Sequence, residues 1–310
     1  MTLRLPLRLG TRGSPLALAQ AHMVKAALAA AHAELSDDRA VEIVVVSTQG
    51  DRIQDRTLAE IGGKGLFTEE IEAGLLDGRL DLAVHSMKDM PTVLPEGLVI
   101  RAVLPRADPR DALIAHGPRS LAELPAGAVI GTASLRRAAQ LRALRPDLDI
   151  VPLRGNVQTR LRKLDGGEVQ ATFLAMAGLL RLGLEHVVSA PLATEEMLPA
   201  VAQGAIGIES RATDEAVLAL LEAINHVPTM RAITAERAFL AALDGSCRTP
   251  IAALAELDGD ALRLRGLVAS PDGGSVERIE VRGAALDGVA LGSAAGASIR
   301  ARLAPGFFAG

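Results

Sequence analysis

The chain has 310 residues, a formal net charge of −4 and 49% hydrophobic residues. This length suggests two or three domains, and the apolar content is sufficient for buried cores, which excludes a disordered chain. With no Trp or Tyr and only five Phe, it lacks aromatic platforms for nucleic acid, and its negative charge argues against polyanion binding over the whole surface. There is no apolar run of the roughly 18 residues that a membrane span needs, and no signal-peptide pattern. We therefore expect a cytoplasmic protein that binds neither nucleic acid nor membrane.

In chain order, short apolar segments alternate with helical patterns through the first two thirds of the sequence, which indicates α/β units around largely parallel sheets. Ser14 and Pro15 are typical of an N-cap and a first helical residue. In the first block we expect strands at 5–10, 41–48 and 80–86 and helices at 16–32 and 66–78. The polar, glycine-rich residues 50–65 are expected to form a mobile loop.

A second block with the same alternation follows "LPRADPRDA". In it we expect strands at 127–132, 149–155, 170–176 and 204–210 and helices at 134–146, 156–167, 214–225 and 229–243. The pattern then changes to short strands separated by DG and GG turns, which predicts an antiparallel meander at 252–257, 262–270 and 275–283. The compositionally monotonous residues 288–303 are predicted as a final helix.

Three strand-to-helix turns share a feature that favours anions: "GTRGSP", "GTASLRR" and "LRGNVQTR". Each places free backbone N–H groups at a helix start beside an arginine, where the helix dipole adds to the attraction. In open α/β sheets such turns gather at the carboxyl ends of the strands, where ligands bind. Residues 131–162 also contain seven arginines and only two acids, a net charge of +5. A solvated helix face explains part of this charge, and a multiply anionic ligand explains the remainder.

Two further stretches carry candidate chemistry. "VHSMKDMP" places His85, Lys88 and Asp89 at a strand end, where they could share proton transfer or simply form a surface pair. Cys247 is the only cysteine and lies in the turn-forming "LDGSCRTP". It is either a small buried apolar residue or a reactive thiol whose thiolate Arg248 favours. The histidines show no metal-ligand spacing and no P-loop is present, so no metal is expected.

This combination of motifs resembles the porphobilinogen deaminase family of tetrapyrrole biosynthesis. The motifs that carry the resemblance, in order, are "TRGSPLALAQ", "GGKGLFTEEIE", "DLAVHSMKDMP", "DPRDA", "GTASLRR", "LRGNVQTRL", "AVAQGAIGIE" and "LDGSCRTPI". The resemblance as a whole is strong over roughly residues 5–252 and continues more weakly to the end of the chain. One departure is Ala133, where many members have a second serine.

The resemblance implies an α/β fold with two periplasmic-binding-protein-like (type II) α/β domains and a small C-terminal α+β domain with an antiparallel three-stranded sheet. The implied domains are residues 1–104 with 203–224, residues 105–202, and residues 225–310. A cleft would lie between the first two domains, and a lid would lie at about 50–65. The strand near "GAIGIE" would return the chain to the first domain.

The resemblance also implies an activity and its site. It predicts a hydroxymethylbilane synthase, a transferase of porphyrin and heme biosynthesis that condenses four porphobilinogens, with release of ammonia, on a dipyrromethane cofactor. The cofactor would be joined to Cys247 by a thioether, and Asp89 would be the catalytic carboxylate. The implied cofactor contacts are Lys88, Asp89, Ser134, Arg136 and Arg137, and the implied substrate and chain contacts are Arg12, Ser14, Lys64, Arg154 and Arg160. The implied protein is a monomer whose product passes to uroporphyrinogen III synthase.

Two competing interpretations share part of this architecture. A non-enzymatic two-domain anion-binding protein would also gather helix N-termini around its ligand, but it would usually carry a secretion signal. Such a protein would also have no reason for a thiol loop after its second domain. A LysR-type effector domain would be expected to follow N-terminal DNA-binding helices, which the sequence lacks. The deaminase interpretation therefore accounts for more of the chain.

Overall fold

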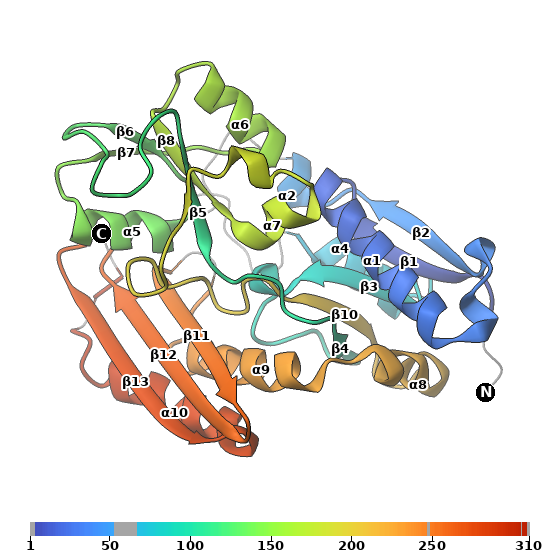
Figure 1. The fold of residues 1–310 in the computed structure, drawn as a ribbon. Helices are drawn as coiled ribbons and strands as arrows, with labels where there is room; N and C mark the ends of the chain where they lie inside the picture. Colours follow the sequence, from blue (N-terminus) through green and yellow to red (C-terminus); the bar gives the residue numbers. More distant parts are fainter. Residues whose placement is uncertain (1–3, 53–66, 247–248, 305, 309–310) are drawn as a thin grey trace. The chain divides into compact units, whose positions relative to one another are not determined.

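The computed structural model describes residues 4–52, 67–246, 249–304 and 306–308 (Figure 1). The chain divides into two compact units. The first unit contains residues 4–52, 67–106 and 205–230, and the second contains residues 107–204 and 231–308. The second unit holds both the second five-stranded sheet and the C-terminal sheet, so the three-domain division expected from the sequence stays a prediction.

The first unit is built on a five-stranded sheet with the order β2-β1-β3-β10-β4. Strand β1 pairs in parallel with β2 and β3, and β10 is antiparallel to both β3 and β4. The elements of this unit are β1 (Leu7–Arg12), α1 (Pro15–Ala31), η1 (Ala33–Leu35), η2 (Asp38–Ala40), β2 (Val41–Val46), α2 (Gln49–Arg52), α4 (Glu69–Leu76), β3 (Leu82–Ser86), the 3₁₀ turn η3 (Met87–Asp89), β4 (Leu98–Val103), β10 (Ile206–Arg211) and α8 (Glu215–Ile224). Helices α1 and α8 pack on one face of the sheet, and α4 packs on the other.

The sheet in the second unit has the order β7-β6-β8-β5-β9 and repeats this plan. Strand β6 is parallel to β7 and β8, and β5 is antiparallel to β8 and β9. Its elements are β5 (Asp111–Ala115), β6 (Val129–Gly131), α5 (Leu135–Leu144), β7 (Asp149–Val151), α6 (Val157–Asp165), β8 (Ala171–Ala175), α7 (Met176–Arg181), η4 (Glu185–Val187) and β9 (Ala190–Pro191). The α/β class expected from the sequence, with two five-stranded sheets and a small antiparallel three-stranded sheet, is confirmed. The sheets are largely parallel, as expected, because four of the five strands in each run in the same direction, but each contains one reversed strand, β10 or β5.

The C-terminal part of the second unit is the antiparallel meander that the sequence predicts, with the order β11-β12-β13. Its elements are α9 (Val227–Ala242), which begins in the first unit and belongs to the second from Arg231 onward, β11 (Ile251–Asp258), β12 (Ala261–Ala269), β13 (Val276–Ala284), η5 (Ala285–Asp287) and α10 (Gly288–Arg300). The monotonous sequence of α10 has a packing reason. A Cβ at Gly292 or Gly296 would collide with backbone carbonyl groups of α9, so only glycine allows the two helices to approach this closely.

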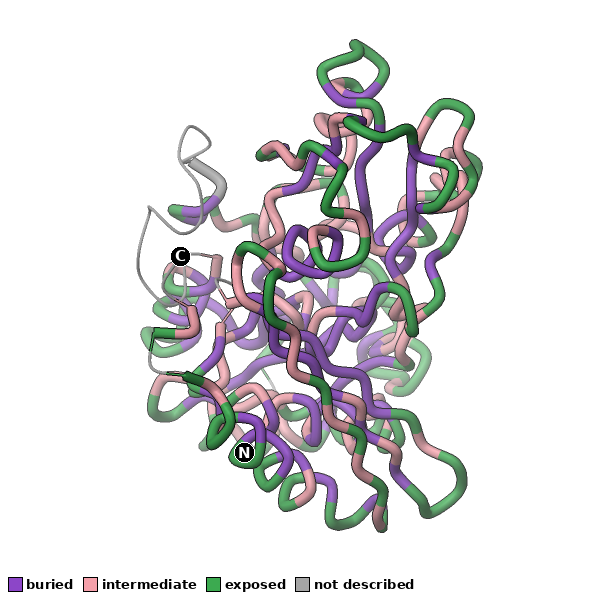
Figure 2. Tube along the Cα trace, turned by 90° about the vertical axis from the view of Figure 1, so that its left-hand side faces the viewer, coloured by how far each residue is buried: buried purple, intermediate pink, exposed green. Residues whose placement is uncertain are grey.

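Apolar side chains bury both faces of the two five-stranded sheets, and Figure 2 shows long buried stretches along the chain with exposed positions at its turns. A separate cluster packs α5 against the C-terminal sheet through Ala139, Leu254 and Leu267. In the part of the chain that the structure describes, no helix combines the length and the apolar character needed to cross a bilayer. These cores hold the strand ends, where the candidate site residues lie.

Candidate functional site

In the first unit, the predicted site residues lie at one edge of the sheet. Strands β1 and β3 are parallel neighbours, so their carboxyl ends lie at the same edge. Arg12 ends β1, and the Ser14 hydroxyl caps α1 by accepting the Ala17 N–H at 3.2 Å, as the sequence predicts. Lys88 and Asp89 form η3, directly after β3, and both are partly exposed. The structure therefore brings Arg12, Ser14, Lys88 and Asp89 to a common edge that a ligand can reach.

The Arg12 guanidinium has an aromatic partner in this unit. Its central carbon lies 4.2 Å from the centre of the Phe67 ring, which is a cation–π distance. Phe67 belongs to the "GGKGLF" motif, and the sequence analysis assigned it no role. Stacking on a ring fixes the plane of the guanidinium, which helps it to meet a carboxylate with two parallel hydrogen bonds.

In the second unit, two helix N-termini meet at one sheet edge. Strands β6 and β7 are parallel, so the turns that follow them lie side by side. The Ser134 hydroxyl caps α5 by accepting the Arg137 N–H at 3.4 Å, and the side-chain Oδ1 of Asn156 caps α6 by accepting the Thr159 N–H at 2.9 Å. Gly155 before this cap has φ of +115°, which favours glycine. Both helices thus present N-terminal N–H groups at the same edge.

Two arginines accompany the α6 turn. Arg154 lies between β7 and α6, and its Nη1 atom is buried without a hydrogen-bond partner among the described residues. The Arg160 Nε donates to the Gly155 carbonyl oxygen at 2.8 Å, which holds the side chain back along its own helix toward the turn. A buried guanidinium nitrogen without an acceptor is costly, and an anionic group at this turn would satisfy it.

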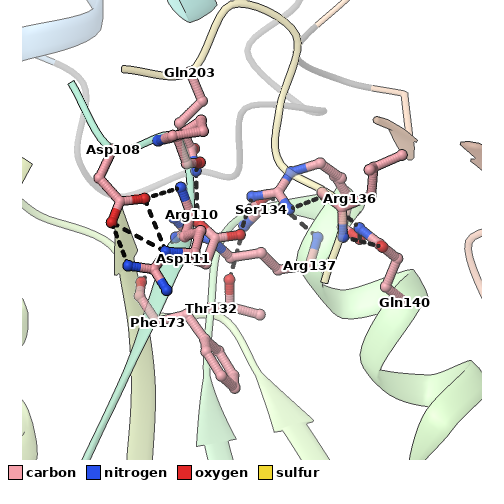
Figure 3. Close-up of polar contacts among 12 residues, drawn as sticks. Asp108, Arg110, Asp111, Thr132, Ser134, Arg136, Arg137, Gln140, Phe173 and Gln203 are labelled. Carbon is pink, nitrogen blue, oxygen red and sulfur yellow. Dashed lines mark hydrogen bonds and ion pairs between the residues drawn. The ribbon is translucent and has the colours of Figure 1, made fainter. Parts of the chain in front are cut away.

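Arg136 and Arg137 on α5 converge on one buried carboxylate, Asp111 (Figure 3). The Nη2 atoms of Arg136 and Arg137 lie 2.7 Å from Oδ2 and Oδ1 of Asp111, respectively. Gln203 donates to the same Oδ1 at 2.9 Å. Arg136 also donates to the main-chain carbonyl oxygen of Leu198, and Arg137 donates to that of Phe173, each at 2.8 Å. Two helical arginines are therefore tied to the first residue of β5.

The charge of Asp111 is maintained by this arrangement. Complete burial raises the pKa of its carboxyl group, but the charges of Arg136 and Arg137 outweigh that effect and hold the pKa well below its usual range. Asp111 is therefore ionised at neutral pH and balances one of the two guanidinium charges. The cluster keeps a net positive charge of one at the α5 N-terminus.

The residues present suit a multiply anionic cofactor. Besides the Arg154 nitrogen, the Nε atoms of Arg136 and Arg137 are buried without hydrogen-bond partners in the described part of the chain. Unsatisfied donors, an excess positive charge and two helix N-termini all favour carboxylates. Arg136 and Arg137 bind Asp111, which gives them a structural role inside the second unit. Their role as cofactor contacts stays a prediction.

Sequence reasoning missed the partners that hold the predicted side chains. Asp111 and Gln203 lie in the motifs "DPRDA" and "AVAQGAIGIE" but were assigned no role, and Asn156 was not recognised as a cap. An acid at the head of the apolar segment "DALIA" is the signal that could have identified Asp111, because a buried carboxylate requires a cation.

Two predicted residues, Cys247 and Lys64, lie outside the described residues, as does most of the expected lid. Ser246 and Thr249, which flank the cysteine loop, are joined by three hydrogen bonds, one of them from the Thr249 N–H to the Ser246 carbonyl oxygen at 3.1 Å. The Ser246 N–H donates to Thr249 Oγ1 at 2.9 Å, and Thr249 Oγ1 donates to the Ser246 carbonyl oxygen at 2.8 Å. In the described ranges, no group of three His, Cys, Asp or Glu side chains could hold a metal ion.

Comparison with known proteins gives matches over nearly the whole chain. Residues 7–219 match the family model "Porphobilinogen deaminase, dipyromethane cofactor binding domain", and residues 230–301 match "Porphobilinogen deaminase, C-terminal domain". The chain is 58% identical over 303 residues to a porphobilinogen deaminase of Paracoccus denitrificans, covering 98% of this chain and 96% of the relative. It is 54% identical over 305 residues to a chloroplastic porphobilinogen deaminase of Oryza sativa, covering 97% and 85%.

Among solved structures, the chain is similar to a periplasmic substrate-binding protein from Coxiella burnetii. It is 15% identical to this chain, with a TM-score of 0.43, and the match covers 72% of this chain and 94% of that one.

Proposed function

The chain belongs to the porphobilinogen deaminase family, and on that premise we propose how its residues assemble hydroxymethylbilane. The protein is a transferase of tetrapyrrole biosynthesis with a dipyrromethane cofactor. The observation that carries the proposal is the pair of family matches, which cover residues 7–219 and 230–301 in order. The competing interpretation, a binding protein without chemistry, is not favoured by them.

In the proposed reaction, four porphobilinogens are joined head to tail. In each addition the aminomethyl carbon of porphobilinogen bonds to a free α-carbon of the preceding pyrrole. The C–N bond breaks, ammonia leaves, and the α-proton of the preceding ring is lost. Water finally releases the linear tetrapyrrole. When bound, the dipyrromethane supplies the first free α-carbon, and in our proposal Cys247 holds it through a thioether bond.

We assign two sets of contacts within this scheme. Lys88, Asp89, Ser134, Arg136 and Arg137 would bind the cofactor, and Arg12, Ser14, Lys64, Arg154 and Arg160 would bind the carboxylates of substrate and growing chain. The supporting observations are the two sheet edges with their capped helices and the buried arginine nitrogens without acceptors. Each pyrrole carries an acetate and a propionate, so the charge to be neutralised grows with every addition.

Asp89 is proposed as the catalytic carboxylate. Loss of ammonia leaves positive charge on the substrate ring, and a fixed carboxylate lowers that barrier if it binds the cation more strongly than the neutral ring. Its place in a short 3₁₀ turn after a buried strand, partly exposed, supports this role. We also propose a cytoplasmic monomer whose product passes to uroporphyrinogen III synthase.

The covalent attachment is tested by mass. Intact wild-type protein is expected to be heavier than its sequence by two pyrrole units, and Cys247→Ser is expected to have the mass of the sequence alone, because only a thiol can form the thioether. Denaturing mass spectrometry makes the measurement. Ser246→Ala is the matched control, since it alters the same loop but keeps the thiol, and it should retain the adduct. An unmodified, fully active wild-type protein would contradict the proposal.

Arg154→Leu is expected to slow addition of porphobilinogen without destabilising the fold, because its buried Nη1 has no acceptor within the described residues. A charge-assisted hydrogen bond is worth about 1.5–3 kcal/mol, so we expect a roughly 10- to 100-fold loss in the addition rate. Mass spectra after limited substrate should show early adducts accumulating. Arg162→Leu is the control, because this arginine is exposed on α6. Equal ladders of adducts in both variants would refute the assignment.

A further inference from the structure

A cluster of ionisable side chains lies buried in the first unit beneath the candidate catalytic edge. The His85 Nε2 atom lies 3.0 Å from Oε2 of Glu209, and their side chains are 4% and 0% exposed, respectively. Glu72 on α4 is also buried and lies close enough for its charge to interact with both. None of these three residues has a part in the proposed reaction.

The strand pairing explains how the cluster forms. Strands β3 and β10 are antiparallel, with Gly207 opposite His85 and Glu209 opposite Ala83. Directly opposite residues point to the same face, and so do alternate residues of one strand, so His85 and Glu209 are diagonal neighbours. This is the face that α4 covers, since Ala83 belongs to the same apolar cluster as Ile71 and Leu75 of α4.

The charges in the cluster favour a single strong pair. Burial raises the pKa of Glu72, a hydrogen bond from Thr68 lowers it, and the charge of Glu209 raises it further, with a net increase. A carboxyl group with a raised pKa is more readily neutral, so Glu72 competes less with Glu209 for His85. The buried Glu209 carboxylate needs a donor, and His85 supplies one at 3.0 Å. Removing His85 alone would leave the Glu209 carboxylate buried without the donor that His85 provides.

The end of β3 is held from both faces. On the α4 face His85 binds Glu209. On the opposite face Ser86 and Gln20 of α1 exchange two side-chain hydrogen bonds, at 2.9 and 3.1 Å. The next residue, Met87, donates its N–H to the Ala205 carbonyl oxygen at 3.1 Å, and its side chain fills the space where Gly207 lacks a Cβ. The three residues directly before Lys88 and Asp89 are thus all fixed by tertiary contacts.

We propose that His85 is a positioning residue for Asp89. Its bond to Glu209 fixes the end of β3 and so fixes where the η3 turn presents the Asp89 carboxylate. The inference rests on the proposed catalytic role of Asp89, and it assigns to a buried pair a function beyond stability. Placement errors of about 1 Å at a reacting group can cost on the order of 100-fold in rate, so a small shift of this turn is sufficient to matter.

The decisive variant is the double substitution His85→Leu with Glu209→Leu. Replacing both partners of a buried polar pair by apolar residues avoids an unpaired charge, so the fold should survive with little change in Tm. Holoenzyme carrying the double substitution should show the wild-type cofactor mass. Its kcat should fall about 10- to 100-fold while KM changes less than about twofold, since the carboxylate is misplaced in the transition state and substrate binding is retained. His85→Gln keeps an N–H donor and should lose less rate.

Arg8→Met is the matched control. Arg8 binds Asp81 with Nε and Nη2 at 2.9 and 2.8 Å, which ties β1 to the beginning of β3, at the end away from η3. This variant should lower Tm and leave kcat of the folded enzyme at the wild-type value. Wild-type kcat in the folded double variant, or an equal loss of kcat in Arg8→Met, would overturn the proposal. Wild-type turnover in Asp89→Asn would instead reject the role of Asp89, so the two failures are distinguishable.

Discussion

Asp89→Asn is expected to fold, to carry the dipyrromethane, and to lose nearly all turnover. The substitution keeps the shape of the side chain in the η3 turn but removes the charge that would stabilise the cation formed when ammonia leaves. Electrostatic groups aimed at a transition state are worth roughly 100- to 1,000-fold in kcat, and we expect a loss in this range. Because Asp89 is partly exposed at the end of a buried strand, the core should not depend on it.

Asp89→Glu separates charge from position. It keeps the carboxylate but displaces it by one methylene, so this variant should retain the cofactor and lose most of the rate. Single-turnover addition of porphobilinogen is the measurement, with adduct mass and circular dichroism as checks on loading and folding. Asp77→Asn serves as a control, since Asp77 is an exposed carboxylate paired with Arg79. Near-wild-type turnover in Asp89→Asn would leave a Lys–Asp surface pair as the better account.

Asp111→Asn is expected to destabilise the second unit strongly and to impair cofactor loading. The neutral amide would leave the Arg136 and Arg137 guanidinium groups buried without their counter-charge. Breaking one partner of a buried ion pair typically costs about 3–5 kcal/mol, a large share of the stability of a domain. Loading should fall because the same two arginines are the proposed cofactor contacts. Urea unfolding and intact mass measure the two effects.

The contribution of Asp111 to the free energy of unfolding should depend on pH only in the acidic range. Its pKa in the folded protein lies below the unfolded value of about 3.9, so its stabilisation is complete above that value and is lost as pH falls through the folded pKa. The difference in unfolding free energy between wild type and Asp111→Asn should therefore be constant from neutral pH down to about 5. Asp108→Asn removes the charge of a carboxylate that pairs with Arg110 and is more exposed than Asp111, so it should lower the free energy of unfolding less. Equal stability of wild type and Asp111→Asn would contradict the counter-charge role.

Features encoded by neighbouring residues were predictable from the sequence. Ser14 caps α1, Ser134 caps α5, and the DG and GG turns separate the strands of the C-terminal meander. Each of these depends on a few consecutive residues, whose hydrogen-bonding and backbone preferences are local. The edges that gather Arg12 with Asp89, and Ser134 with Arg154, also followed, because parallel strands end at the same side of a sheet.

Partners far apart in the sequence were not predictable. Asp111 is 26 residues from Arg137 and 92 residues from Gln203, and no pattern in the sequence indicates that these side chains contact one another. The arginine-rich segment was interpreted as a ligand surface, but two of its members also balance a buried acid, which only tertiary structure reveals. The antiparallel directions of β5 and β10 were missed for the same reason, since strand direction depends on the path between strands.

The position of β10 between β3 and β4 has a consequence for how the protein is made. A ribosome completes β3 and β4 before it begins the second block, yet the strand that joins them is added only after that block. His85 is therefore synthesised 124 residues before its partner Glu209. Until then the nascent first unit lacks the strand between β3 and β4, and the η3 turn lacks the contacts of His85 with Glu209 and of Met87 with Ala205. Chain synthesis thus completes the support of the turn that carries Asp89, the proposed catalytic carboxylate, only after the second α/β block has been made.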